Sequence, residues 1–518
     1  MLLRLLTYAY AIAFVVGMGT QAFAQESGSA ETDARIQALE LRVQQLEKAL
    51  AEALGIETAE PPPPAEDATT VAQAEPAPNG NNRSDITGQQ GAYNYDKAFF
   101  GPIAPLSSSD GRFKTFLYGN LQTDLAAYSE SGDWEGVFGD DYYIGKGDTD
   151  FSGGAKMRRA SFGIANVVEQ DWIVFMSYNL ADGGEQVDSG LRAAAIVYRG
   201  IKPWWLMAGQ FGNSVGLESS TFNSFLGMAE RPMMSNAFAY APSAPVMALI
   251  ASHRGKLTYS RFGVFGKNSG VDSDFDEGWG LHGRFLLQPH RERRLSSHIG
   301  VSGYWRKPEE EVVGADHMRS CPEGSMGSGF RFRAFGISAV DGTSLVNTGK
   351  FCAVEDYTYV VAEGALSRGP VSLQGEWGTA QVNTKSSGSY EFSGGYVDVG
   401  YFLTGESRNY NPYFGQFWRL KPDNDLGQGG LGAFELRARW QMIDLNDRLA
   451  VVDGNVTGVT GGEASGFTVG LNWYFNAFTR AIFNAGRIDV EYPTAVGGRL
   501  GTREASVDEY VARVEIFF

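Results

Sequence analysis

The sequence lacks any internal hydrophobic run long enough for a membrane-spanning helix. The chain has 518 residues. After the N-terminal segment, no stretch approaches the roughly 18 to 20 continuous apolar residues that such a helix needs. The apolar content of 43% is ordinary, so a bundle of membrane helices is excluded. Glycine (66 residues) and aromatic side chains (13%) are abundant instead. This composition is typical of many short β-strands joined by turns.

The chain also lacks an excess of basic residues. Its 43 lysines and arginines are outnumbered by 60 aspartates and glutamates, and the formal net charge is −17. A general nucleic-acid binder usually carries a basic footprint, so we expect no nucleic-acid partner. The net charge leaves the charge of any single local site open.

Cysteine is scarce, because the chain has only Cys321 and Cys352 and no CxxC pair of the kind that holds zinc. If the chain is exported, it enters an oxidising compartment, which favours a disulfide between the two cysteines that cross-links one loop. Two unpaired thiols are the alternative.

Catalytic and metal-binding motifs are almost absent. The five histidines show no HExxH spacing, and no GxxxxGK[ST] phosphate loop occurs. One GxSxG match, GNSVG at Gly212–Gly216, lacks the strand before it and the helix after it that a nucleophile elbow needs. We interpret it as a chance match, with a hydrolase that uses Ser214 as the alternative. No enzyme activity, cofactor or metal site is expected.

The first residues predict export. Arg4, an apolar stretch over residues 5–18 and an A-x-A pattern at residues 22–24 are typical of a secretory signal peptide. Residues 1–24 are therefore predicted to be removed after Ala24, with an uncleaved anchor helix as the alternative. Export places the mature chain beyond the inner membrane of a bacterium-like cell.

Residues 25–54 predict a short coiled coil, and residues 55–110 a flexible linker. Arginines at g positions and glutamates at e positions of the heptads carry complementary charges, which favours self-association over a lone amphipathic helix. The linker is rich in Pro and Ala and cannot bury a core. The apolar a and d positions are Ile36, Leu39, Val43, Leu46, Leu50 and Ala53.

From residue 111 to residue 518 the sequence alternates with a period of two. In GAFELRARW, Phe434, Leu436, Ala438 and Trp440 share one face, while three charged residues share the other. The same period recurs in many segments, including the last strand, where Phe518 belongs to the apolar face. At about 25 residues per strand, residues 111–518 hold roughly 16 strands. We therefore predict an all-β fold, a transmembrane antiparallel β-barrel of about 16 strands.

A secreted β-sandwich would also alternate, so further features decide between the two folds. Short turns at residues 367–369 and 475–478 contrast with a long stretch from Pro308 past Cys352, as expected of short turns on one side of a barrel and long loops on the other. Aromatic residues near strand ends fit interface girdles. These are Trp204, Trp205, Trp440 and Phe518.

Several segments resemble the phosphate-selective porin O and P family over roughly residues 110–518. The resemblance implies a trimeric, 16-stranded outer-membrane channel for phosphate, polyphosphate or other anions, with arginines and lysines in a constriction loop. The stretch that matches the constriction holds one basic residue, Arg231, beside Glu218 and Glu230, so a dense ladder of arginines is not found in it. The resemblance is carried by MRRASFGI (157–164), WWLMAGQFGNSVGLESS (204–220), GYVDVGYFLTGESRNY (395–410), GQGGLGAFELRARWQMIDLND (427–447) and GGEASGFTVGLNWYFN (461–476).

Basic residues on the polar faces of the strands are the candidates for an anion path. Arginine suits oxyanions because its planar fork donates two parallel hydrogen bonds. The alternative is that these arginines pair with Glu376, Glu435 and Glu515 and only stiffen the wall. Because Arg158 adjoins Arg159, alternation predicts that one of the two faces lipid. The candidates are Arg112, Lys114, Arg159, Arg231, Arg284, Arg306, Arg437, Arg439 and Arg513.

The predicted function is a passive diffusion channel for small hydrophilic solutes, with a preference for phosphate-like anions, in the bacterial outer membrane. The expected partners are the lipid bilayer, two further copies in a homotrimer, inorganic anions or other small solutes, and the barrel-assembly machinery, for which Phe518 is the expected C-terminal signal. The alternative is a structural tether or adhesin that reaches the cell wall through its coiled coil and transports little.

Overall fold

The computed structural model describes residues 105–134, 151–181, 190–212, 215–239, 245–267, 278–308, 330–351, 353–385 and 387–518. All of them belong to one compact unit, Asn82–Phe518. The predicted signal peptide, the coiled-coil segment, most of the linker, both cysteines and Ser214 lie outside the described residues.

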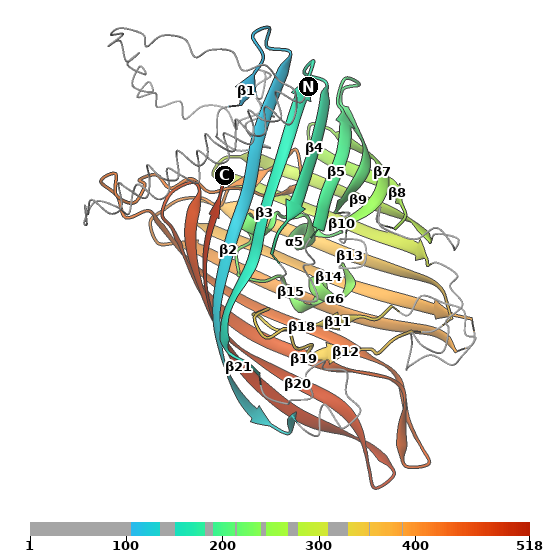
Figure 1. Ribbon diagram of the computed structural model, residues 1–518. Coiled ribbons are helices and arrows are strands. Elements are labelled where there is room, and N and C mark those ends of the chain that lie inside the picture. Colours follow the sequence, from blue (N-terminus) through green and yellow to red (C-terminus); the bar gives the residue numbers. More distant parts are fainter. Residues whose placement is uncertain are drawn as a thin grey trace, which may run out of the picture. The chain divides into compact units, whose positions relative to one another are not determined.

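One antiparallel sheet contains nearly all of the described strands and closes into a barrel (Figure 1). Each strand pairs with the next along the chain, and β2 closes the ring by pairing with β21 from Asn120↔Phe517 to Gly132↔Ala505. The prediction of a barrel of 16 antiparallel strands is confirmed. They are β2 (Phe113–Gly132), β3 (Gly154–Val168), β4 (Trp172–Asn179), β5 (Gly190–Tyr198), β6 (Trp204–Gly212), β7 (Pro245–Arg254), β8 (Thr258–Phe265), β9 (Trp279–Glu292), β10 (Leu295–Lys307), β13 (Val354–Arg368), β14 (Val371–Thr384), β15 (Gly388–Phe402), β18 (Ala433–Val452), β19 (Asn455–Tyr474), β20 (Thr479–Val496) and β21 (Arg499–Phe517).

The remaining strands are short. β1 (Leu106–Ser107) pairs with the beginning of β2, at Thr115 and Lys114, a few residues before the position in β2 where the pairing with β21 starts. Two further pairs lie in connections, β11 (Arg333–Ala334) with β12 (Val346–Asn347) and β16 (Tyr410–Asn411) with β17 (Gln416–Phe417). Within the described residues, no helix is long and apolar enough to cross a membrane.

The apolar residues of the alternating pattern lie on the outer face of the barrel, and the polar residues lie on its inner face. Along β2, Leu121 and Leu125 are 43% and 57% exposed, while Gln122 and Asp124 are fully buried. A water-soluble protein rarely exposes apolar side chains around its whole circumference, so this outer surface suits lipid. The apolar face points outward and the polar face points inward, as in a membrane barrel.

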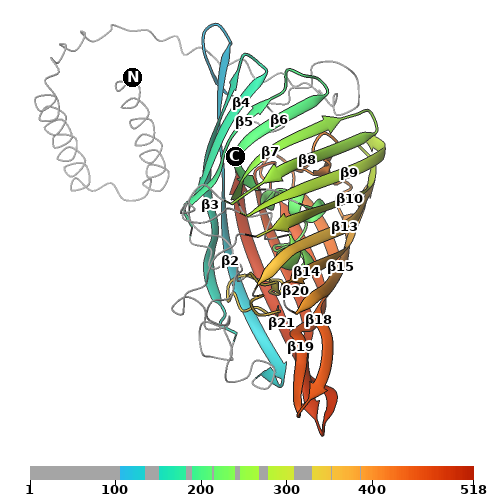
Figure 2. The same cartoon turned by 90° about the vertical axis from the view of Figure 1, so that its right-hand side faces the viewer.

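The connections define two ends of the barrel (Figure 2). We call the end where β2 begins and β21 ends the turn end, and the opposite one the loop end. Six connections at the turn end are short, but residues 403–432 form a long one. Three connections at the loop end are also short, at residues 385–387, 453–454 and 497–498. The expected division into short turns and long loops therefore holds with four exceptions.

A β-bulge corrects the expectation that Arg158 or Arg159 faces lipid. Gln122 pairs with Arg159 and Thr123 pairs with Met157, so Arg158 is an extra residue in β3. Both arginines are buried, 2% and 7% exposed, and both side chains line or anchor the interior. The bulge restores the register and removes the cost of a cation in lipid.

The alternation in the sequence predicts a polar interior throughout the barrel. The structure differs, because part of the interior is apolar. Residues 330–351 fold inside the barrel at the β13–β21 side, where Phe332, Leu345 and Val346 pack into one large apolar cluster. Inward-facing wall residues such as Ile443 and Val507 join this cluster. Because an inner segment covers these positions, they pack as in the core of a soluble protein rather than facing channel water.

Candidate functional site

Two stretches of chain fold into the barrel from opposite ends. The inner segment 215–239 comes from the loop end and contains α5 (Leu217–Ser220), η1 (Asn223–Phe225) and α6 (Met233–Phe238). The inner segment 403–432 comes from the turn end and carries β16 and β17. They meet where the Trp418 ring lies 5.4 Å from that of Phe222 and 5.2 Å from that of Phe225, measured between centroids.

The inner segment 215–239 begins at a glycine that the wall requires. Gly216 has φ 91°, and a Cβ there would lie 2.3 Å from the Glu376 carboxylate. That carboxylate accepts hydrogen bonds from the backbone N–H groups of Leu217 (2.7 Å) and Glu218 (3.0 Å). A side chain at position 216 would displace the acceptor that orients α5.

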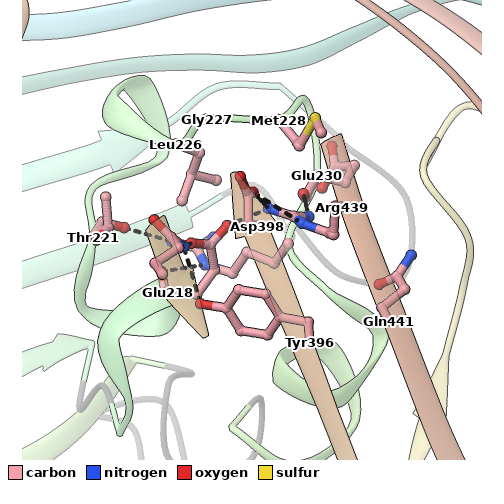
Figure 3. Close-up of polar contacts among 12 residues, drawn as sticks. Glu218, Thr221, Leu226, Gly227, Met228, Glu230, Tyr396, Asp398, Arg439 and Gln441 are labelled. Atoms are coloured by element: carbon pink, nitrogen blue, oxygen red, sulfur yellow. Dashed lines mark hydrogen bonds and ion pairs between the residues drawn. The ribbon is translucent and has the colours of Figure 1, made fainter. Parts of the chain in front are cut away.

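Arg439 ties the same segment to the wall (Figure 3). Its guanidinium lies 2.9 Å from Glu218 Oε1 and 3.0 Å from Asp398 Oδ2, and it donates to the Glu230 carbonyl at 2.8 Å. Arg437 pairs with the same Asp398 and, at 2.6 Å, with Glu435. These side chains are almost completely buried, so each charge depends on its partners.

Glu230 forms a second anchor. Arg158 donates to both of its carboxylate oxygens, at 2.7 Å and 3.0 Å, and Arg513 lies 2.7 Å from Oε1. Arg513 also forms a forked pair with Asp124, at 2.6 Å to each oxygen. Strands β2, β3 and β21 are thus joined to one carboxylate of the inner segment.

The backbone of the inner segment is fastened by wall side chains as well. These contacts hold the segment against strands β10, β18, β19 and β20 of the wall. They are Gly216 N to Ser302, Ala229 N to Asn484, Met233 N to Gln441, Asn472 to Gly227 O and Arg480 to Leu226 O, at 2.7 to 2.9 Å.

On the other side of the inner segment a cavity of ≈ 600 Å³ follows the β2–β8 wall. Every inward-facing residue of β4, from Ile173 to Asn179, lines it. By strand rise this stretch is about 20 Å long. The cavity reaches Arg192 and Pro245 near the loop end, and Arg419 near the turn end. The cavity lies between this wall and the two inner segments.

The described lining of this cavity is strongly basic, although the chain is acidic. It includes eight arginines, no lysine, no aspartate and one glutamate, Glu230, which Arg158 and Arg513 already neutralise. Burial lowers the pKa of Arg419 to about 10, so this guanidinium keeps its charge at neutral pH. The eight are Arg158, Arg159, Arg192, Arg231, Arg254, Arg261, Arg284 and Arg419.

Four of these arginines have no carboxylate at ion-pair distance in the described part of the chain. Arg159 donates to Gln122 (2.7 Å), and Arg231 donates to Asn223 Oδ1 (2.5 Å) and the Thr221 carbonyl (2.8 Å). Arg419 lies over the Phe517 ring at 4.5 Å. Arg261 on β8 has a buried Nε with no acceptor. Within the described residues, the cavity therefore carries guanidinium groups that form no ion pair.

The sequence candidates fall into three groups. Arg159, Arg231 and Arg284 line the cavity, the last in a 2.7 Å ion pair with Glu363. Arg437, Arg439 and Arg513 lie in the ion-pair network that anchors the inner segment 215–239. The other three lie apart from the cavity lining: Arg112, exposed and paired with Glu169 at the turn end, half-buried Lys114, and Arg306 on β10, over the Phe265 ring.

Sequence reasoning missed five of the lining arginines. Arg261 could have been found by parity, the rule that every second residue of a strand faces the same side. Phe262 and Val264 on β8 face outward, so Arg261, which has the opposite parity, faces inward. Arg419 lies in a connection without periodicity, so no pattern marks it. Trp205 was also misassigned, because its ring faces inward and carries the Arg254 guanidinium at 3.9 Å, whereas Trp440 is 47% exposed on the outside.

A family model described as "Phosphate-selective porin O and P" matches residues 136–498. The chain belongs to this family. It is a porin, a channel of the bacterial outer membrane, and the resemblance seen in the sequence is confirmed. The described residues of this porin contain no group of three or more His, Cys, Asp or Glu side chains that could hold a metal ion.

Two curated relatives are similar over most of the chain. Porin O of Pseudomonas aeruginosa is 25% identical over 384 residues, 72% of this chain and 82% of that protein. An uncharacterized protein of Caulobacter vibrioides is 27% identical over 473 residues, 88% of this chain and 82% of that protein.

Among solved structures, the porin is similar to the outer membrane protein OmpT of Vibrio cholerae. The TM-score is 0.46 with 10% identity, over 80% of this chain and 100% of that one. The outer membrane channel DcaP of Acinetobacter baumannii gives a TM-score of 0.43 with 11% identity, over 80% of this chain and 100% of that one.

Proposed function

We propose that this porin is a passive diffusion channel that prefers anions, phosphate-like oxyanions among them. The observation that carries the proposal is the lining of the cavity, in which eight arginines stand against one neutralised glutamate. A ring of fixed charge sets the sign of the ion that a pore conducts. The similarity to Porin O of Pseudomonas aeruginosa, in the family named for phosphate selectivity, supports the same preference.

The four arginines without a carboxylate partner are the proposed anion path. Arg159 comes from β3, Arg231 from the inner segment 215–239, Arg261 from β8 and Arg419 from the inner segment 403–432. An oxyanion that passes along the β4 face can exchange water for guanidinium N–H groups at several points. No site needs to bind tightly, which allows both entry and release.

Arg437, Arg439 and Arg513 have a different proposed role. Their charges are already matched by Asp398, Glu435, Glu218, Asp124 and Glu230 at 3.0 Å or less. Arg439 and Arg513 set the width of the channel by fixing the inner segment, whereas Arg437 holds wall carboxylates. All three contribute little to the sign of the ion that the channel selects. These three arginines thus take a stiffening role, although of the carboxylates named for that alternative only Glu435 is among their ion-pair partners.

The test is the reversal potential of the purified porin in a planar bilayer across a KCl gradient. We expect chloride to be more permeant than potassium. The Arg159→Gln/Arg261→Gln double variant should lower that preference by roughly half, since it removes two of the four arginines that form no ion pair within the described residues. Arg487→Gln is the matched control, because Arg487 is 51% exposed on the outer face and pairs with Asp489. A wild-type channel that prefers cations overturns the proposal. If the wild-type protein shows no conductance, the structural tether is the function that remains.

We also propose that the porin assembles as a homotrimer, to which the predicted N-terminal heptads add a parallel contact. The family resemblance and the heptad pattern support this. Light scattering of the detergent-solubilised porin gives the protein mass directly. A mass of one chain would contradict the assembly without affecting the channel proposal.

A further inference from the structure

The two inner segments meet at a patch of rings that faces channel water. Trp418 stacks on Phe414 with centroids 5.4 Å apart and planes at 9°. The Phe222 ring is edge-on to Trp418, and the Phe225 ring is tilted against it. We call these four side chains the aromatic patch. Phe222, Phe225 and Phe414 line the cavity, and Trp418 lies behind them.

Phe222 is unusual within this patch because its side chain is 45% exposed. It lines the aqueous passage rather than the lipid surface. Its neighbours in sequence, Thr221 and Asn223, are both hydrogen-bonded to Arg231. Burial of the exposed part of this apolar ring by a solute would be favourable, because it removes apolar surface from water.

Cations surround the patch. Arg419 lies over Phe517 at 4.5 Å and near Phe225 at 5.8 Å. Arg254 lies between Trp205 and Phe414, at 3.9 Å and 5.6 Å from their ring centroids, and donates to the Tyr413 carbonyl at 3.0 Å. The patch therefore places a partly exposed aromatic ring, Phe222, next to guanidinium groups that line the same cavity.

We propose that the aromatic patch is a solute-binding subsite for organic anions that carry a planar aromatic ring, such as aryl phosphates and aryl carboxylates. The solute ring packs against Phe222 and Phe225, and its oxyanion is held by Arg231 and Arg419. Inorganic phosphate uses only the second of these contacts. This inference rests on the proposed anion preference and narrows its substrate class.

Three probes of related charge separate the contributions. Phenyl phosphate carries an aromatic ring and an oxyanion. Cyclohexyl phosphate has the same oxyanion but replaces the aromatic ring by an apolar ring without a π face. Inorganic phosphate has the oxyanion alone. Each is added to the wild-type channel in a planar bilayer, and the concentration that halves the chloride current is measured. Because an aromatic pair contributes about 0.5–1.5 kcal/mol beyond its buried area, phenyl phosphate should act at about two- to twelvefold lower concentration than cyclohexyl phosphate.

Two variants test the assignment to the patch. Phe222→Ala should remove the difference between phenyl and cyclohexyl phosphate. Phe222→Leu keeps the apolar bulk, so it should lose the phenyl preference even if the loop needs a large side chain. Phe483→Ala is the matched control, because Phe483 is 47% exposed on the outer face of β20.

The outcomes are separable from those of the proposed function. An anion-selective wild-type channel in which phenyl phosphate blocks no better than cyclohexyl phosphate overturns the aromatic subsite alone. Retention of the phenyl preference in both Phe222 variants overturns it as well. A wild-type channel without anion preference refutes the proposed function, whatever the block by phenyl phosphate.

Discussion

Arg513 and Glu230 join the last strand of the barrel to the inner segment that narrows it, through an ion pair of 2.7 Å. Arg513 also pairs with Asp124 on β2, across the seam where the barrel closes. Glu230 also pairs with Arg158 on β3. Closure of the barrel and placement of the inner segment 215–239 therefore share one buried charge network, so a change in one is expected to affect the other.

The first prediction concerns Glu230→Gln. This variant keeps the shape of the side chain but leaves Arg158 and Arg513 without the carboxylate that they share, and removal of one partner of a buried ion pair costs about 3–5 kcal/mol. We expect unfolding at lower urea concentration, followed by the loss of the fast-migrating folded form in unheated SDS gels. Asp489→Asn breaks an exposed pair with Arg487 and should cost about 0–1 kcal/mol. Equal losses in the two variants would refute the network.

The second prediction separates two neighbouring arginines. Arg439→Met removes the contacts to Glu218 and to the Glu230 carbonyl, so the inner segment should loosen and the single-channel current should become larger and noisier. Arg437→Met is the control, since the hydrogen bonds of Arg437 go to Asp398 and Glu435, both on the wall. Its current should stay as steady as that of the wild type. Identical traces from all three proteins would show that Arg439 does not hold the constriction.

The wall of this porin could be predicted from its sequence, because the period of two is local. Leu436 and Trp440 point outward and Arg437 and Arg439 inward, as alternation predicts for that strand. Alternation failed at Arg158, where a single inserted residue shifts the register without changing the composition of the strand.

The site was less predictable, because its contacts join distant residues. Arg513 and Asp124 are 389 positions apart, and only the closed barrel brings them together. Parity places a side chain inside the barrel but does not say which carboxylate will meet it. Parity therefore could not distinguish the anchoring arginines, such as Arg439, from the arginines of the open cavity, such as Arg261.

The third prediction is that anion preference depends on ionic strength. Uncompensated charge on Arg159 and Arg261 acts through water, and the Debye length shrinks from about 10 Å at 0.1 M salt to about 3 Å at 1 M. The chloride-to-potassium permeability ratio should therefore fall as the mean KCl concentration rises between these limits. The Arg159→Gln/Arg261→Gln variant should show a flatter dependence. A wild-type ratio that does not change with salt would mean that selectivity arises from direct coordination rather than from the field of these charges.

The fourth prediction concerns the end of the chain, where Phe518 pairs with Gly119 through two backbone hydrogen bonds of 3.1 Å. The Phe518 ring lies over Gly119, and a Cβ at that glycine would come within 2.8 Å of the ring and 2.5 Å of the Ser161 carbonyl. Gly119→Ala should therefore push β3 or the terminal ring aside and weaken closure of the barrel at the seam. We expect a smaller folded fraction after refolding into detergent, measured by heat-dependent gel migration.

Gly283→Ala is the matched control for that measurement. Gly283 also lies within a barrel strand, β9, but the nearest atom to its added Cβ is the Arg261 carbonyl at 4.0 Å. Both variants add the same methyl group and lose the same backbone freedom of glycine in the unfolded chain, so this contribution cancels in the comparison. The difference in folded fraction then reports the steric conflict at the seam. If both variants refold as well as the wild type, the contact between Gly119 and Phe518 does not limit closure of the barrel.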